Sequence, residues 1–202
     1  LKNVMQFDGS TWGPMGPGIL GGVAGAMAFA NYQGDLYMGG VFYQSSGNAG
    51  QSIMRWDGAE WDAVGDLQIN DNSDQYAASV YSLAVHDGLL FAGGSFSFAN
   101  HVPVPNIATW DGTKWCSLGG SLDPQVRTMS FFHDTLYVGC GGYLADTVLS
   151  NGAAKFIGST FQEECSTVGI QDPPTPGGSF RVASREPDVV SLMVLADGPH
   201  QV

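Results

Sequence analysis

The stretch WDGTKWCSLGG, residues 110–120, places two tryptophans five positions apart around an Asp-Gly pair. The same spacing recurs in WDGAEWDAVGD (56–66), in FDGSTWGPMG (7–16) and, in reduced form, in FIGSTF (156–161). Each copy keeps an aromatic residue, a glycine two positions later and a second aromatic residue five positions after the first. A period of roughly fifty residues is typical of a repeat architecture.

The segment VYSLAVHDGLLFAGGSFSF, residues 80–98, supplies the rest of one repeat. Apolar residues alternate with smaller or polar ones up to an Asp-Gly pair at 87–88, and the apolar run then resumes, which predicts a β-hairpin. NIATW, Asp111-Gly112 and TKWCSLG predict a second hairpin after it. The repeats that end in EWDAVGD and in STFQEEC follow the same order. The chain is therefore predicted to be all-β, with four short antiparallel strands in each repeat.

Composition limits the classes of partner. The 202 residues are 44% hydrophobic and 13% charged with 29 glycines, which favours many turns over helices. No apolar run is long enough for a transmembrane segment. Seven basic against 19 acidic residues give a net charge of −12, which argues against nucleic acid as a partner and suits an extracellular setting.

The glycine doublets identify a family resemblance. Gly39-Gly40 and Gly93-Gly94, each after an aromatic-containing strand and ahead of a tryptophan strand, resemble the kelch-type repeats of β-propellers, including the galactose-oxidase-like propeller. The third copy departs from this pattern because YVGCGGY inserts Cys140. The resemblance covers residues 1–166 and implies β-propeller blades. No set of residues matches the copper ligands of galactose oxidase, so that activity is not expected.

About three and a half blades are visible, because residues 1–20 supply only the second half of a blade. Closed propellers use about four to eight blades. The chain is therefore expected to be a fragment of a larger propeller, with the two partner strands upstream. The alternative is that the C-terminal segment donates them.

The C-terminal region changes in character. Residues 167–179 are rich in proline and glycine and are predicted to be a linker. Residues 180–202 resemble the opening strands of the β-sandwich sorting domain of the type IX secretion system. That resemblance implies the type IX secretion machinery as a partner and a location outside the cell or on the outer-membrane surface.

Several conspicuous side chains have a structural and a chemical interpretation. Asp8, Asp57 and Asp111 share one position of the repeat and could form a ring of carboxylates, but Asp-Gly is a strong hairpin signal, so the turn interpretation is favoured. The flanking tryptophans are interpreted as packing residues rather than as a sugar platform. His86 and His133 each precede an aspartate at the first hairpin turn of successive repeats and are interpreted as turn residues.

One segment suggests a metal. NDNSDQY, residues 70–76, carries oxygen-bearing side chains at alternate positions, and such oxygens can converge on Ca²⁺. It lacks the glycine and the distal glutamate of an EF-hand loop, so a polar insertion between two repeats is the favoured alternative. The candidate calcium ligands are Asn70, Asn72 and Asp74, and no other cofactor is expected.

Three cysteines are present. In an exported protein one pair is expected to oxidise, and Cys140 with Cys165 is the predicted pair because both belong to the final, least regular repeat. The alternative is that all three are buried small hydrophobic residues.

The predicted function is a non-enzymatic binding or structural role, with a glycan or protein ligand held by the loops between the repeated motifs. The alternative is an extracellular polysaccharide-active enzyme, with its catalytic residues in absent blades or among Asp66, Asp71 and Asp74. No carboxylate pair stands out, so binding is preferred. The predicted ligand-binding residues are Gln44, Asn48, Asp71, Asn72, Asn100 and His101.

Overall fold

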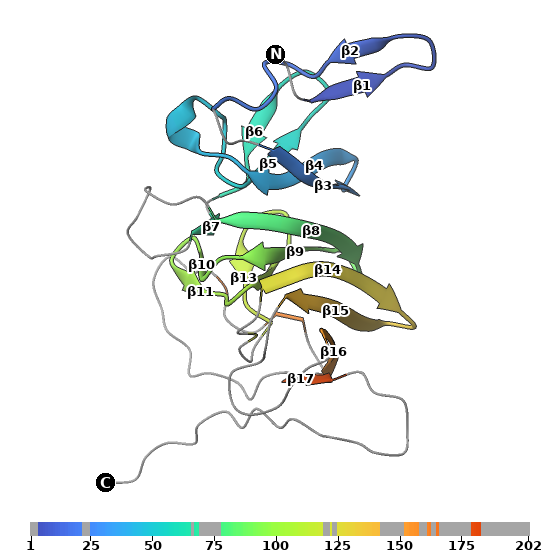
Figure 1. Ribbon diagram of the computed structural model, residues 1–202, viewed down its shortest axis with the longest axis vertical. Coiled ribbons are helices and arrows are strands. Elements are labelled where there is room, and N and C mark those ends of the chain that lie inside the picture. Colours follow the sequence, from blue (N-terminus) through green and yellow to red (C-terminus); the bar gives the residue numbers. More distant parts are fainter. Residues whose placement is uncertain are drawn as a thin grey trace, which may run out of the picture.

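The chain folds into a series of small antiparallel β-sheets (Figure 1). The computed structural model describes residues 4–21, 25–65, 67–68, 78–118, 122, 125–141, 152–157, 161–162, 165 and 179–182. Within this part of the chain all regular structure is strand apart from one 3-10 turn, which confirms the all-β prediction. No helix in the described part is long and apolar enough to cross a membrane.

Four units follow one another in chain order, each built from neighbouring strands. The N-terminal hairpin contains β1 (Met5–Phe7) and β2 (Trp12–Pro14). Sheet 1 contains β3 (Gly25–Tyr32), β4 (Asp35–Val41), β5 (Ile53–Trp56) and β6 (Trp61–Ala63). Sheet 2 contains β8 (Ser79–His86), β9 (Leu89–Ser95), β12 (Ile107–Trp110) and β13 (Trp115–Cys116). Sheet 3 contains β14 (Gln125–Phe132), β15 (Thr135–Gly141), β16 (Ala153–Ile157) and β17 (Ser179–Val182).

The two kinds of connection lie at opposite ends of the sheets. In Figure 1 the arrowheads of β8 and β14, where tight hairpin turns begin, point to the right, whereas β7, β10 and β11 gather on the left. These three short strands form a separate sheet in the order β11-β10-β7. Longer connections therefore share one end, which we call the loop end. The three short strands at this end are β7 (Leu67–Gln68), β10 (Phe98–Ala99) and β11 (Val102–Pro103).

The first hairpin turn of each sheet has two residues, both with positive φ. This is the backbone of a type I′ turn, whose twist matches that of the flanking strands. The equivalent turns are Gln33-Gly34, Asp87-Gly88 and His133-Asp134. His86 and His133 are consequently not equivalent, because His86 is the last residue of β8 and pairs with Leu89.

Each glycine doublet lies where another part of the chain comes close. A Cβ atom on Gly93 would lie 2.6 Å from Cγ1 of Val126 in sheet 3, and a Cβ atom on Gly39 would meet Val80 of sheet 2 in the same way. The second glycine, Gly94, faces the backbone of its own first strand at Ser79. The doublet is thus required for close packing of consecutive sheets and for a close approach within one sheet.

Cys140 replaces the second glycine of the doublet and is not an insertion. It pairs with Val126 just as Gly94 pairs with Val80 and Gly40 with Ala26. Sheet 3 therefore accommodates a side chain at a place where sheets 1 and 2 have none.

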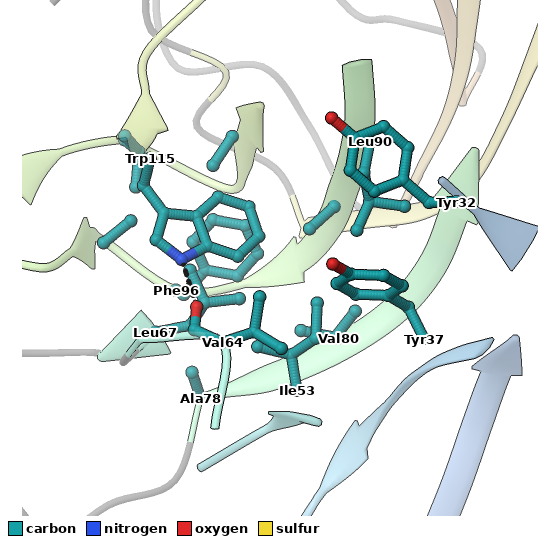
Figure 2. Packing of buried hydrophobic residues seen from close by; sticks show 14 residues of the cluster. Tyr32, Tyr37, Ile53, Val64, Leu67, Ala78, Val80, Leu90, Phe96 and Trp115 are labelled. Carbon is teal, nitrogen blue, oxygen red and sulfur yellow. Dashed lines mark hydrogen bonds between the residues drawn. The ribbon is translucent and has the colours of Figure 1, made fainter. Parts of the chain in front are cut away.

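Three separate hydrophobic cores fill the spaces between consecutive units. Sheet 2 contributes to two of them, because Leu90 and Ala92 of β9 point into the core shared with sheet 1 and Phe91 points into the core shared with sheet 3. Figure 2 shows the middle core, in which Trp115 and Tyr37 lie among aliphatic side chains from both sheets. Each sheet is therefore stabilised mainly by its immediate neighbours, as in other repeat proteins.

The outer strand of sheet 3 differs from the prediction. STFQEEC was expected there, but β17 pairs with β16 instead, with Phe156 opposite Phe180. Cys165 forms its bridge with Cys116 of β13. Residues 180–182, which were predicted to belong to the C-terminal segment, thus pair with β16 as part of sheet 3. Residues 183–202 and the linker up to residue 178 lie outside the described residues.

Candidate functional site

The loop between β4 and β5, residues 42–52, is held by a buried amide. Asn48 is 7% exposed, and its Nδ2 donates to the carbonyls of Leu20 (2.9 Å) and Tyr43 (2.7 Å). Its Oδ1 accepts from the backbone N–H of Leu20 at 2.7 Å. Both amide donors are thus used within the chain, so Asn48 fixes the loop, and the ligand contact predicted for it stays a prediction.

Gln44 lies at the tip of the same loop. It begins the 3-10 turn Gln44–Ser46, its side chain is exposed, and its Nε2 is 3.4 Å from the carbonyl oxygen of Ala49. The turn ends at Gly47 with φ of 93°, a conformation that glycine adopts without steric cost. The predicted ligand residue Gln44 is therefore presented to solvent on a locally closed turn.

The corresponding loop of sheet 2, residues 96–106, is built as a hairpin. β10 pairs with β11 on one side and with β7 on the other, so the connection that leaves sheet 1 is tied to the loop of sheet 2. Asn100 and His101 form the turn, with φ of 47° and 68°. Asn100 is half-buried beside Gly65, and His101 is exposed.

A residue with a left-handed backbone precedes the third strand of each sheet. Ser52, Asn106 and Gly152 have φ of 63°, 64° and 82°, and the carbonyl of each accepts a hydrogen bond from the doublet position of its sheet. Two of the side chains also reach the next unit: Ser52 Oγ donates to Ala78 at 2.7 Å, and Asn106 Nδ2 donates to Leu122 at 2.7 Å. These hydrogen bonds join the base of each loop to the start of the following sheet.

The other predicted site residues fall outside the described part of the chain. These are the calcium candidates Asn70, Asn72 and Asp74, the loop residue Asp71 and the carboxylate Asp66. Among the residues that the structure does describe, no three His, Cys, Asp or Glu side chains gather as metal ligands would.

The recurring aspartates are turn residues. The Asp57 carboxylate accepts hydrogen bonds from the backbone N–H groups of Ala59 (2.8 Å) and Glu60 (2.9 Å). The carboxylates of Asp8 and Asp111 likewise accept hydrogen bonds from the backbone N–H groups two and three residues later in the chain. The backbone hydrogen bonds to Glu60 and Ala59 lower the pKa of Asp57 below 3.8. In these three turns the glycine after the aspartate has positive φ and the aspartate does not, so the aspartate acts by accepting hydrogen bonds.

In two of the motifs a tryptophan at the second aromatic position joins neighbouring units. Trp115 Nε1 donates to the Val64 carbonyl at 2.6 Å, and Trp61 Nε1 donates to the Met15 carbonyl at 3.1 Å. Met15 and Val64 hold the same position in their own repeats, three residues after the second aromatic. Trp61 and Trp115 therefore pack and form hydrogen bonds within the chain. Trp12, which holds the same position in the N-terminal hairpin, is largely exposed, at 66%.

The disulfide differs from the predicted pair. Cys116 is bonded to Cys165, and Cys140 is a free thiol. Residues 161–165 were assigned to sheet 3, but Phe161 and Cys165 lie against sheet 2, where the Phe161 carbonyl accepts a hydrogen bond from Thr109 at 3.2 Å. Cys140 is half-buried, and this burial raises the pKa of its thiol to about 11.

His86 packs between sheets 2 and 3. Its ring stacks on Phe131 with centroids 4.0 Å apart, and its Nε2 lies 3.5 Å from a carboxylate oxygen of Asp134. Phe91 and Phe161 complete the aromatic group around it. The residue therefore has a packing role between two sheets, not the turn role predicted from its sequence neighbours.

One recurring position was missed by the sequence reasoning. In the first strand of each sheet the pairing register shifts by one residue, at Met27, Tyr81 and Arg127. Such a β-bulge redirects one side chain, and the Arg127 guanidinium lies 4.5 Å from the centre of the Tyr81 ring. The available signal was an extra residue that interrupts the alternation ahead of each glycine doublet.

No protein-family model matches the chain, and no curated protein matches it.

Proposed function

We propose that the sheets are blades of a kelch-like β-propeller, and that the chain binds a glycan or protein ligand through its loop end without catalysing a reaction. Three observations support the propeller: chain-order strands in each sheet, one packing interface per pair of sheets, and the recurrence of the same turns, bulges and aromatic pairs. Four-stranded sheets arranged in this way are the units from which propellers are built.

The observation that carries the binding role is the fixed base of the two described loops. Asn48, Ser52 and Asn106 use buried or half-buried polar atoms to hold the loops, while Gln44 and His101 are exposed at the tips. A loop that is already ordered loses less conformational entropy when it binds a ligand. The repeated aspartates and the buried tryptophans, by contrast, are engaged in turns and sheet contacts, whereas Gln44 and His101 are exposed to solvent.

A glycan array and a protein-capture assay, each with and without Ca²⁺, test this proposal. The variants Gln44→Ala and His101→Ala are expected to weaken binding by about tenfold each, or roughly 1.4 kcal/mol, in a chain that remains folded. Glu60→Ala is the matched control, because Glu60 is exposed in the β5–β6 turn at the opposite end of sheet 1. Turnover of a polysaccharide, or equal loss of binding in the control, would contradict the proposal.

We also propose that the protein lies outside the cell or on the outer-membrane surface. The Cys116–Cys165 disulfide supports this, because such bonds persist in oxidising compartments. Export by the type IX secretion machinery is tested by fusing residues 166–202 to a reporter in a bacterium that has this system. Retention of that reporter inside the cell would remove the machinery from the list of partners and leave the loop-end proposal intact.

A further inference from the structure

The first strand of sheet 1 carries a phenylalanine that lacks the cover its equivalents have. Leu83 in β8 and Met129 in β14 occupy the corresponding position and pack on Gly39 and Gly93 of the preceding sheet. Phe29 in β3 is 49% exposed. The unit in front of it is the two-stranded N-terminal hairpin, and among the described residues no glycine doublet faces the Phe29 ring.

The N-terminal hairpin is docked on sheet 1 in the same way as sheet 1 is docked on sheet 2. Val4 and Met15 are 3% and 5% exposed, and both belong to the core that the hairpin shares with sheet 1. Their equivalents in sheet 1, Ile53 and Val64, are buried in the core shared with sheet 2. The N-terminal hairpin therefore contacts sheet 1 through the same kind of interface that joins sheet 1 to sheet 2.

One edge of β1 is open within the described part of the chain. β1 pairs with β2 on one side, from Met5 opposite Pro14 to Phe7 opposite Trp12. The corresponding strands β5 and β12 pair on both sides, with β4 and β9 as their inner neighbours. The open backbone groups of an edge strand are a template for a further strand.

We propose that the free edge of β1 and the exposed ring of Phe29 form a docking site for a two-stranded β-hairpin from a further copy of this repeat. The strand of that hairpin that pairs with β1 is the equivalent of β9 and also brings its glycine opposite Phe29, and the other strand is the equivalent of β8. Glycine is required opposite Phe29, because a Cβ atom at the equivalent Gly93 would lie 2.6 Å from Val126 and 2.9 Å from Met129.

The need for a glycine opposite Phe29 argues against a simple pairing between two copies of the chain through β1. Two β1 strands side by side would form a sheet, but neither copy would bring a glycine-bearing strand to Phe29. Met5, Phe7 and Phe29, which are 48%, 52% and 49% exposed, would remain partly uncovered. A complete repeat hairpin covers the ring and satisfies the β1 edge together.

The test is a graft of residues 79–106, which contain β8, β9 and their following loop, in place of residues 1–3. In sheet 2 this segment leads directly into Ile107, the equivalent of Val4, so the junction keeps the natural loop length. The graft is expected to raise Tm by about 5 °C, given the apolar area covered at Phe29 and the β1 edge. The same graft carrying G93V is the matched control and is expected to give no rise.

The Phe29→Ala substitution locates the contact. It is expected to lower Tm by several degrees more in the grafted chain than in the parent chain, since only the graft buries the ring. Equal effects in the two chains, or equal Tm values for the two grafts, would overturn the proposal. Sedimentation of the parent chain adds a further test: a dimer that Phe29→Ala dissolves would assign the surface to a second copy instead.

Discussion

Trp12 and Trp115 occupy the same place in two copies of one motif, yet one is 66% exposed and the other is fully buried. Their local surroundings match, because each ring lies 5.2 Å from its partner aromatic and each hairpin has the same aspartate-bonded turn. Within the described residues, sheet 1 receives the ring and the N–H group of Trp115, and no described sheet covers the Trp12 ring in this way. The motif therefore builds a hairpin by itself, whereas its stabilising energy comes from the neighbouring sheet.

The largest effect is expected at Trp115. Trp115→Ala should lower the free energy of unfolding by about 3–5 kcal/mol through loss of the buried ring, and Trp12→Ala should change it by less than about 1 kcal/mol. Urea denaturation followed by circular dichroism measures both. Trp115→Phe keeps an aromatic ring but removes the N–H group that donates to the Val64 carbonyl. It therefore measures the contribution of the hydrogen bond and should lower the free energy of unfolding by about 1–2 kcal/mol. Similar losses for Trp12→Ala and Trp115→Ala would contradict the comparison.

The second largest effect is expected at the disulfide, which ties Cys116 of the Trp115 hairpin to a distant part of the chain. Cys116→Ala should lower the free energy of unfolding by about 2–4 kcal/mol, because it opens a loop of 49 residues in the unfolded chain. Cys140→Ala is the control with a free thiol and should have a smaller effect. Mass spectrometry of the peptides after alkylation checks the pairing directly. A Cys140–Cys165 peptide would refute the assignment.

The glycine doublet allows a third comparison. Gly94→Ala should cost about 1–3 kcal/mol, since its new Cβ meets the backbone of Ser79, which cannot move without disturbing β8. Gly13→Ala in the exposed β2 has no atom within 4 Å of the new Cβ and should be within about 0.5 kcal/mol of wild type. Both are measured by thermal and urea unfolding. Equal costs would mean that the close approach at the doublet does not constrain the residue type.

The smallest effect is expected from the turn aspartates and appears only in acid. The pKa of Asp57 is lowered below 3.8 by backbone hydrogen bonds to Glu60 and Ala59, so its stabilising contribution is present above pH 3.8 and is lost as the pH falls through the lowered pKa. Asp57→Asn keeps the acceptor but does not titrate. Unfolding midpoints between pH 2 and pH 5 should therefore vary less in Asp57→Asn than in wild type, and a steeper dependence would contradict the assignment.

Sequence predicted the fold class and most strands, because alternation, Asp-Gly pairs and glycine doublets act within a few residues of each other. It failed where the pairing of a residue or strand depends on a part of the chain that is distant in sequence. Cys116 is bonded to Cys165, 49 residues further along the chain, and the outer strand of sheet 3 is β17, which lies far along the chain from its partner β16. Nothing local distinguishes Ser179–Val182 from an independent strand.

For the candidate site, the sequence indicated the loops but not the side chains that hold them in place. Gln44 and His101 are exposed in loops, as the sequence indicated, but Asn48 is buried and bonded to Leu20 and Tyr43. Polar composition identifies a loop and does not show which of its amides face inward. The anchors Ser52 and Asn106 were not predicted, because their role depends on carbonyl groups in the next sheet.

The alternating side chains of β9 have a consequence for how the molecule opens. Leu90 and Ala92 are buried on one face of the strand and Phe91 on the other, so β9 contributes to two cores at once. Fraying from either end of the chain can dissolve one core and leave the other to hold this strand. Hydrogen exchange should therefore be graded along the molecule, with the slowest amides in β9 and its partner β12 and faster exchange in the N-terminal hairpin.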